Sequence, residues 1–481
     1  MYKVKVKGGH LRLLFFFLLF PINSHALFQK IYFGYKDSDR LKAINLDEKI
    51  IQADFDFNLN RYDWRFELGG NASDSYLQSL FSFQSQQTIK NTYSLGVTKS
   101  SFKYGTFSLS HQQSRYDISN WEAASLSSFS DDELYETKNI INYSYDFLNR
   151  SGVVDLEKIH VQNEIENIKY SLEVQKDYLD FFHAYSDAKI RIILERYYNE
   201  FERRAAKRVN LVRKRVRDGL SRSHELSQAQ ISLLSQQETV LKNKNLLRER
   251  LIALENLIRI KIEKAHYQTV DWTYKEKERF IPLFQGDTFL ELKQLEKLNK
   301  LNDLNITLSK TDADHSLNLG LSYAKNSVDT NKSEAFNNSF GSGVNDEATV
   351  ALTYSIPIGN LKTDTLKKKL LAQRNKTKLS QMNLKADLLV KIKVLNENIE
   401  RYKTGIQLAK KRVQLSTASI DQHQKLYVRG QVSFEEVLRS EEAFISAKIS
   451  LVNMFSLYDL SLAQLAFLHG NTVAFLNKYT D

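Results

Sequence analysis

Two glycine-containing turns divide this chain into two similar halves. The first begins at Gly219 and the second at Gly430, and each lies between two long runs that contain no proline. The separation of these two glycines equals that of Glu225 and Glu436. The same separation holds for two further pairs, Tyr143 with Tyr354 and Asn149 with Asn360. A constant offset over so many positions indicates one duplicated unit, and this constrains the fold more than any other feature.

Each turn has the chemistry of a sharp reversal between two helices. Only glycine adopts positive φ without a steric cost, so Gly219 and Gly430 suit the end of a helix. Ser433 then suits the N-cap of the next helix, and Glu436 stands where a capping box places its acidic residue. We therefore predict two helical hairpins that reverse at these positions.

The helices of these hairpins are expected to be very long. Between Ser151 and Gly219 the only internal glycine is Gly152, and apolar residues recur every three or four positions. Roughly 70 residues at about 1.5 Å each make a rod of about 100 Å, which suits a wall across the periplasm better than a globular domain. The second rod carries an apolar repeat of about 3.5 residues, which predicts left-handed supercoiling against a neighbour. Its members are Leu384, Leu388, Ile392, Leu395, Ile399, Tyr402, Ile406, Ala409 and Val413.

Ahead of each rod the apolar period changes to two. This period predicts strands that place one face against an apolar medium and the other against water. The clearest examples are 315–325 and 348–356, and the first half has similar segments at 64–68, 91–99, 103–111 and 141–147. Polar stretches between the strands are expected to be loops. These stretches are 71–90, 116–134 and 327–346.

The N-terminus has the pattern of a secretory signal. Four cations precede a short apolar core at 13–20, and Ser24-His25-Ala26 is a small-x-small cleavage site. No later segment has the roughly 18 consecutive apolar residues of a membrane helix. The chain has no cysteine for disulfides. For an exported chain without a membrane helix, three locations remain possible: the periplasm, the exterior, or an outer membrane crossed by a β-barrel.

The residues that carry chemistry elsewhere show no catalytic or metal-binding pattern. The ten histidines are scattered, without the spacing of metal ligands. No nucleophile elbow or phosphate-binding glycine loop is present. We therefore expect neither an enzyme nor a cofactor. A basic run on the first rod is interpreted as a solvated outer face, since nucleic acid is a poor partner after export. Its members are Arg203, Arg204, Lys207, Arg208, Arg213, Lys214, Arg215 and Arg217. The alternative to a solvated face is a surface that docks an adaptor or the cargo.

The order of these features resembles the TolC family of outer-membrane efflux proteins over nearly the whole mature chain. The resemblance rests on the duplication, on the passage from strand to helix at 352–360, and on the two turns, of which that at Gly430 is the more typical. It implies a mainly α-helical fold with a transmembrane β portion. Three copies would close one shared 12-stranded β-barrel, with four strands from each, and their coiled-coil hairpins would form a periplasmic α-barrel.

This resemblance implies a domain plan. Residues 1–26 are a signal peptide, 266–286 a linker and 471–481 a short polar tail. The first repeat is 27–265, with strands at about 62–147, a helical hairpin at about 150–265 and a tip at 219–225. The second repeat is 287–470, with strands at about 315–358, a helical hairpin at about 361–470 and a tip at 430–436.

The first repeat departs from the family pattern in its strands. It has four strand-like segments where the family needs two. The extra pair is 91–99 and 103–111. These segments either enlarge the barrel or form a hairpin outside it, and the sequence leaves both possibilities open.

The resemblance also implies roles for residues near the two tips. Glu436 would face a periplasmic constriction, where three copies make an acidic ring that attracts cations; alternatively, it only caps its helix. Arg439 replaces a second acidic residue of the family and would weaken that ring. Tyr427 and Glu225 match a polar pair that holds the gate shut, although a tyrosine at helical spacing more often packs in a seam.

The tip turns themselves would contact a periplasmic adaptor, the membrane fusion protein. Val432 stands where the family often has a basic latch residue, so at least one expected latch is missing. The tip residues are Gly219, Leu220, Ser221, Gly430, Gln431, Val432 and Ser433.

The expected function is that of a homotrimeric outer-membrane channel. It would be the passive exit duct of an inner-membrane pump and its adaptor, in drug efflux or type I secretion. Its barrel would contact outer-membrane lipid, its helices would extend into the periplasm, and no nucleic acid would bind. The alternative is a periplasmic coiled-coil adaptor or scaffold that has no membrane-spanning barrel.

Overall fold

The computed structural model describes residues 24–60, 62–76, 85–121, 133–148, 151–263, 267, 270, 272, 280, 289–311, 315–341, 345–356 and 361–480. The chain divides into two compact units. One comprises Met1–Ile44, Glu173–Thr288 and Leu388–Asp481, and the other comprises Asn45–Leu172 and Phe289–Asp387. The expected signal peptide lies outside the described residues up to position 23, and so does most of the expected linker.

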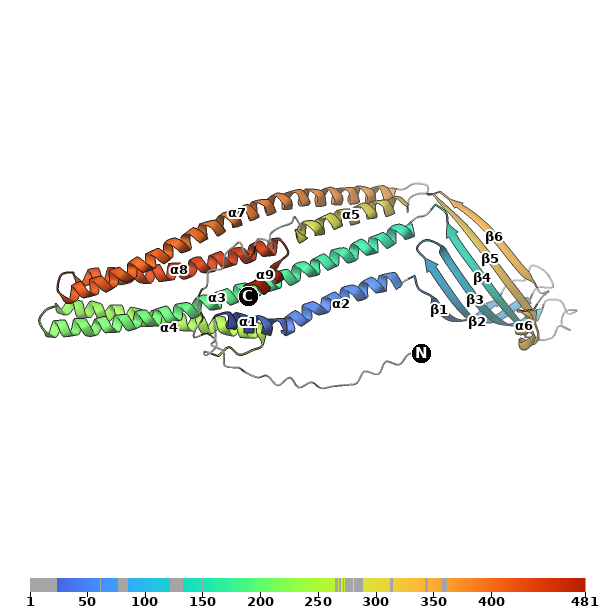
Figure 1. The fold of residues 1–481 in the computed structure, drawn as a ribbon. Helices are drawn as coiled ribbons and strands as arrows, with labels where there is room; N and C mark the ends of the chain where they lie inside the picture. Colours follow the sequence, from blue (N-terminus) through green and yellow to red (C-terminus); the bar gives the residue numbers. More distant parts are fainter. Residues whose placement is uncertain are drawn as a thin grey trace, which may run out of the picture. The chain divides into compact units, whose positions relative to one another are not determined.

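The second unit contains one six-stranded antiparallel sheet (Figure 1). Each strand pairs with its neighbour in the sequence, and the pairing of β4 with β5 joins the two repeats. The described strands thus form an open sheet with β1 and β6 at its edges. They are β1 (Arg65–Tyr76), β2 (Ser85–Ser101), β3 (Gly105–Trp121), β4 (Leu134–Asp146), β5 (Ser316–Asp329) and β6 (Asp346–Ser355).

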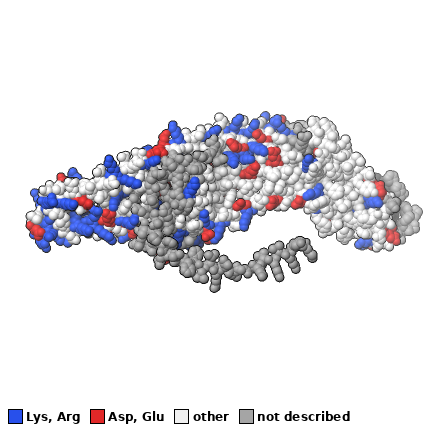
Figure 2. Space-filling model, in the orientation of Figure 1, with Lys and Arg blue, Asp and Glu red and all other residues white. Residues whose placement is uncertain are grey.

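The register gives the sheet one apolar face. Directly opposite residues on neighbouring strands share a face, and leucine lies opposite leucine at Leu68–Leu95 and Leu319–Leu352. The other face carries mainly serine, threonine, asparagine and glycine. Much of the sheet surface that is visible in Figure 2 is free of charged side chains, and several charged side chains lie at its far end. Members of the apolar face are Phe66, Leu68, Tyr93, Leu95, Val97, Phe107, Leu109, Ile141, Tyr143, Leu317, Leu319, Leu321, Tyr323, Val350, Leu352 and Tyr354.

The strands extend further than the sequence predicts. Much of the expected loops 71–90 and 116–134 is strand, because Asn71–Tyr76 pairs with Gln87–Thr92 and β3 continues to Trp121. Polar cross-strand contacts support these ends, as where Gln87 Nε2 donates to Asp74 Oδ1 at 3.1 Å. A strand with polar residues on both faces has the composition of a loop, so the prediction of loops was wrong here.

The expected loop 327–346 also contains regular structure. Its first residues continue β5, and α6 (Lys332–Asn338) follows and packs against β4 and β5. Asn331 caps this helix by accepting a hydrogen bond from the Ser333 amide. This helix of about two turns was missed because seven residues carry too little periodicity to be detected.

Long helices form the two predicted hairpins (Figure 1). Helix α3 (Ser151–Arg217) has 67 residues and α7 (Leu361–Val428) has 68. They reverse into α4 (Ser223–Ile258) and α8 (Phe434–Leu468). Along α7 the predicted repeat places Leu388, Ile399 and Ile406 in the core. Helices α2 (Asp39–Asn60) and α5 (Leu290–Thr311) lie just ahead of the strands in each half of the sequence.

The two hairpin turns have the same backbone geometry. Gly219 has a φ of 68° and Gly430 a φ of 73°, so both have the positive φ that the sequence predicts for these turns. In each turn the amide after the glycine donates to a carbonyl five residues earlier, Leu220 to Arg215 and Gln431 to Leu426. This is the long bond of a Schellman motif. The duplication is therefore visible at the level of individual hydrogen bonds.

Short helices at both ends of the chain complete the core of the first unit. Helix α1 (Ser24–Lys36) buries Phe28, and α9 (Thr472–Thr480) buries Phe475 and Tyr479. The rings of Phe28 and Tyr479 lie 5.1 Å apart. The expected polar tail at 471–481 is thus largely a packed helix. The polar residues of this segment masked the pattern of its two buried aromatic residues, Phe475 and Tyr479.

Helix α8 is the one described helix that is long and apolar enough, by composition alone, to cross a membrane. Of its most apolar window, 56% is buried inside the protein. Tyr458, Leu462 and Ala466 on this helix are fully buried in the helical core. Its hydrophobic character is explained by packing among the other helices.

Candidate functional site

The two hairpin turns are joined by an arginine that the sequence analysis placed on a solvated face. Arg215 on α3 donates from Nη1 to the Val428 carbonyl at 2.7 Å and from Nε to Ser221 Oγ at 3.1 Å. Its guanidinium also lies 4.7 Å from the centre of the Tyr427 ring, in cation–π contact. The solvated interpretation is therefore wrong for Arg215, which ties the last residue of α7 to the turn of the first hairpin.

The structure brings together the predicted pair Tyr427 and Glu225. The Tyr427 hydroxyl donates to Glu225 Oε2 at 2.9 Å and lies 3.2 Å from Ser221 Oγ. Tyr427 is only 4% exposed, and its ring packs against Phe434. Burial raises the pKa of the Tyr427 phenol, Ser221 opposes this shift, and the bond to Glu225 adds to it. The phenol therefore remains a donor at neutral pH, and the residue both packs in the seam and forms the polar contact.

Glu436 lies in the first turn of α8 and Arg439 in the second, and the two do not pair with each other. Glu436 accepts a hydrogen bond from the Ser433 amide at 3.0 Å, and its own amide donates to Ser433 Oγ at 3.2 Å. This is the predicted capping box. Arg439 instead contacts Glu435 at 2.6 Å. The helix-capping role of Glu436 is thus present, and its role at a constriction stays a prediction.

The predicted tip residues differ in their surroundings. Leu220 is 65% exposed and offers an apolar contact at the turn. Gln431 and Ser433 are also exposed. Val432 is half-buried and packs beside Tyr427 in a small apolar cluster. The two turns therefore present a surface that mixes one leucine with polar groups.

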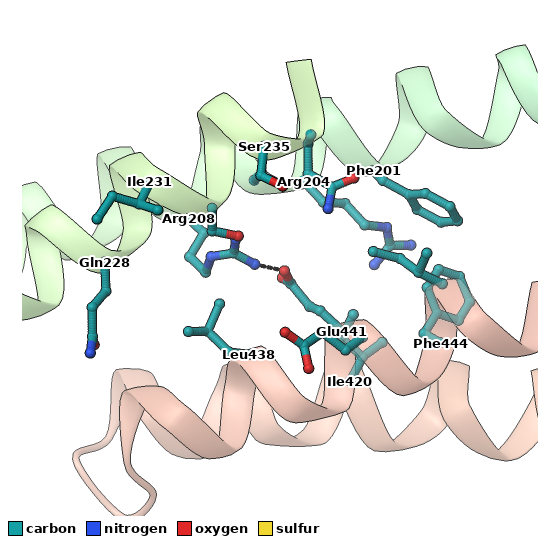
Figure 3. A pocket seen from close by; sticks show the side chains of 15 residues that line it. Phe201, Arg204, Arg208, Gln228, Ile231, Ser235, Ile420, Leu438, Glu441 and Phe444 are labelled. Carbon is teal, nitrogen blue, oxygen red and sulfur yellow. Dashed lines mark hydrogen bonds and ion pairs between the residues drawn. The ribbon is translucent and has the colours of Figure 1, made fainter. Parts of the chain in front are cut away.

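A buried ion pair lies further along the hairpins, between Arg208 on α3 and Glu441 on α8 (Figure 3). Their side chains are 5% and 9% exposed. Arg208 Nη2 also donates to Ser232 Oγ on α4 at 2.7 Å, and Gln424 on α7 donates to Glu441 Oε1 at 3.3 Å. Burial lowers the pKa of Arg208 to about 10, so the guanidinium is charged at neutral pH. This one network connects all four helices of the two hairpins.

Sequence reasoning missed this ion pair. Arg208 was assigned to the solvated basic run, and Glu441 was not considered. The available signal was helical spacing, because Arg208 lies one position from Val209 and four from Val212, both of which are buried. That places the arginine beside the apolar seam rather than opposite it.

A second polar cluster ties α3 to α8. Lys448 Nζ contacts Glu200 Oε2 at 2.7 Å, and Arg204 contacts the same carboxylate at 3.1 Å. Burial alone would raise the pKa of Glu200, but the two cations outweigh it and hold that pKa below its usual value. Both cations also lie over the Phe444 ring. This cluster holds opposite charges at the same helix interface as the buried pair.

Two cavities flank these contacts. One, of about 380 Å³, is lined by residues of all four hairpin helices, among them Phe201, Ile231 and Ile420 (Figure 3). The other, of about 630 Å³, has a basic wall that includes Arg203, Lys207 and Lys425. Many Lys and Arg side chains gather over this end of the hairpins (Figure 2). Among the residues that the structure describes, no three histidine or acidic side chains form a group that could hold a metal ion.

Solved structures of outer-membrane proteins share this fold, an antiparallel sheet joined in sequence to two long helical hairpins. The outer membrane protein VceC of Vibrio cholerae matches with a TM-score of 0.68 at 13% identity, over 93% of this chain and 96% of that chain. The CmeC outer membrane channel of Campylobacter jejuni matches with a TM-score of 0.58 at 12% identity, over 95% and 89%. The MtrE outer membrane channel of Neisseria gonorrhoeae, in its open state, matches with a TM-score of 0.58 at 14% identity, over 95% of this chain and 94% of that chain.

These matches confirm the fold expected from the sequence and cover nearly its whole length. No protein-family model matches the sequence, and no curated protein matches it either. At such low identity the similarity establishes the architecture of the chain.

Proposed function

We propose that this protein is a passive channel of the outer membrane, with helical hairpins that extend into the periplasm. The observation that carries the proposal is the exposed apolar face of the sheet, formed by residues such as Leu68, Val350 and Leu352. Apolar patches of this kind mark a surface that meets lipid or another protein. The fold of the VceC, CmeC and MtrE structures, described as an outer membrane protein and two outer membrane channels, supports the same location.

The open sheet requires other copies of the chain in this setting. Among the residues that the structure describes, strands β1 and β6 each have one edge without a paired strand in the single chain. Each unpaired backbone group in lipid costs several kcal/mol, so only a closed barrel is stable there. We propose a homotrimer in which the three sheets close one barrel and the hairpins form a shared periplasmic tunnel.

The contacts between the hairpins would hold the periplasmic end of the tunnel closed. The bond from Tyr427 to Glu225 is reversible, and the buried pair Arg208–Glu441 adds a second tie. A periplasmic adaptor would bind the tip turns, where Leu220 is exposed, and shift these contacts towards an open state. An inner-membrane pump would supply the energy, for efflux or for type I secretion. Three copies of Glu436 would add negative charge near the constriction.

The contact with lipid can be tested at two adjacent residues. Leu352 lies on the apolar face of β6 and Thr353 on the polar face, and both are exposed in the single chain. The chain has no cysteine, so Leu352→Cys and Thr353→Cys each introduce one thiol. In liposomes a charged, membrane-impermeant maleimide should label the Thr353→Cys variant and leave the Leu352→Cys variant unlabelled.

Equal labelling of the two variants would contradict the proposal, because both faces of the sheet would then be in water. That result would favour a periplasmic adaptor or scaffold. Labelling in detergent-free denaturant serves as the control, since both thiols must react once the chain is unfolded.

A further inference from the structure

The β2–β3 hairpin is an integral part of the sheet. All 12 residues of β1 pair with β2, and β3 pairs with β4, so the hairpin separates two strands that would otherwise be neighbours. Each of its strands has 17 residues, whereas a strand that crosses a membrane needs about 9–11. Length and pairing therefore allow both strands to span.

The faces of this hairpin match those of its neighbours. Opposite pairs carry the apolar stripe from β1 to β4, through Leu68–Leu95, Val97–Leu109 and Leu109–Ile141. The polar face is continuous as well, with Gly69 opposite Ser94 and Ser108 opposite Asn142. A hairpin outside the barrel wall would have no reason to keep one face apolar in register with the other strands.

The turn of the hairpin is fixed against the start of α3. A Cβ atom at Gly152 would lie 2.3 Å from the Phe102 carbonyl oxygen, so only glycine allows this approach. The rings of Phe102 and Tyr62 lie 3.7 Å apart, and the Tyr143 hydroxyl donates to the Tyr104 carbonyl at 2.9 Å. The end of β2 and the beginning of β3 are thus held where β4 passes into helix.

From these observations we infer that each copy contributes six strands, not four, to the membrane-spanning wall, and that the β1 edge of one copy pairs with the β6 edge of the next. All five pairings within the chain are antiparallel, so β1 and β6 run in opposite directions and their pairing keeps the wall antiparallel throughout. The inference rests on the proposed function. For a trimer, three times six strands give an 18-stranded barrel. Since barrel diameter grows roughly linearly with strand number, it would be about 1.5 times as wide as a 12-stranded barrel.

Thiol labelling tests whether the hairpin lies in the wall. In liposomes the charged maleimide should label the Ser110→Cys variant on the polar face and fail to label the Leu109→Cys variant on the apolar face. The Leu352→Cys and Thr353→Cys variants serve as matched controls on β6. Equal labelling at 109 and 110, with the control pair still different, would overturn the six-stranded wall and leave the channel in place. Equal labelling within the control pair would instead refute the proposed function.

Cross-linking tests the strand order independently. A short bifunctional thiol reagent should join the two thiols of the Leu68→Cys/Leu95→Cys variant, because these residues lie directly opposite on β1 and β2. It should fail on the Leu68→Cys/Ile141→Cys variant, whose strands are three spacings or roughly 14 Å apart. Efficient joining of residues 68 and 141 within one chain would place β1 beside β4 and exclude the hairpin from the wall.

Discussion

The buried guanidinium of Arg208 forms an ion pair with the buried carboxylate of Glu441, across the interface between the two hairpins. Both groups have further partners on α4 and α7, so four helices depend on one pair of charges. Removing one member leaves the other charge buried without its partner, which costs more than the pair contributes by itself.

We expect Glu441→Gln to lower the free energy of unfolding of the helical part by about 3–5 kcal/mol. Glu238→Gln, at an exposed position of α4, is the matched control. It removes an exposed carboxylate and should change stability by less than about 0.5 kcal/mol. Urea unfolding followed by circular dichroism measures both. Equal effects of the two variants would show that the buried pair has no special weight.

The hydrogen bond between Tyr427 and Glu225 should couple the two residues energetically. Hydrogen bonds to a charged group contribute about 1.5–3 kcal/mol. Tyr427→Phe and Glu225→Gln should therefore each destabilise the closed tip, and their combination should cost clearly less than the sum. A double-mutant cycle on unfolding measures the coupling, and Glu238→Gln, an exposed position of α4, replaces Glu225→Gln in the control cycle. Strict additivity in the first cycle would rule out the contact.

The two turn glycines are needed for their backbone conformation. A Cβ at Gly219 would meet no atom within 4 Å, and one at Gly430 would reach only Arg215 Nη2 at 4.0 Å. The cost of Gly430→Ala is therefore that of a left-handed residue, about 1–2 kcal/mol. Gly430→Asn should cost less, since asparagine tolerates this region. Thermal unfolding of the two variants should rank them in that order, and the reverse order would contradict the account.

Acid should weaken the contact of Glu200 with Lys448 and Arg204. The folded-state pKa of Glu200 lies below its usual value of 4.5, so its contribution to stability is present above that pH and is lost as pH falls. We expect the stability difference between wild type and Glu200→Gln to shrink below about pH 4.5. Thermal midpoints of both proteins between pH 6 and pH 3.5 measure it. A constant difference over that range would show that the ion pair does not link stability to pH.

The sequence predicted the features that repeat or follow one period. The glycine turns, the capping box at Ser433, the long rods and the pair of Tyr427 with Glu225 all follow from local spacing or from the family resemblance. The paired polar ends of the strands could not be predicted, because polar strands and loops have the same composition. The burial of the Arg208 charge was missed as well, because buried and solvated arginines stand in the same basic run. Nothing in the basic run distinguishes Arg208, whose partner Glu441 is more than two hundred positions away.

The ends of the first unit show a similar limit. Helix α9 is short, and the sequence alone does not show that its aromatic residues are buried. Their burial depends on the ring contacts of Phe475 with Phe182 and of Tyr479 with Phe28. The strand order also required the structure. Alternation identified the segments that became β2 and β3, but only their pairing with β1 and β4 places them inside the sheet.

The conductance of the protein in a planar bilayer tests most directly whether it is a channel closed at its tip. We expect small, steady steps from wild type and larger or more frequent openings from the Tyr427→Phe/Glu225→Gln variant, because that variant lacks the closing hydrogen bond. The conductance of the Glu238→Gln variant should equal that of wild type. Silence from wild type and the tip variant alike, with both proteins well folded, would contradict the channel.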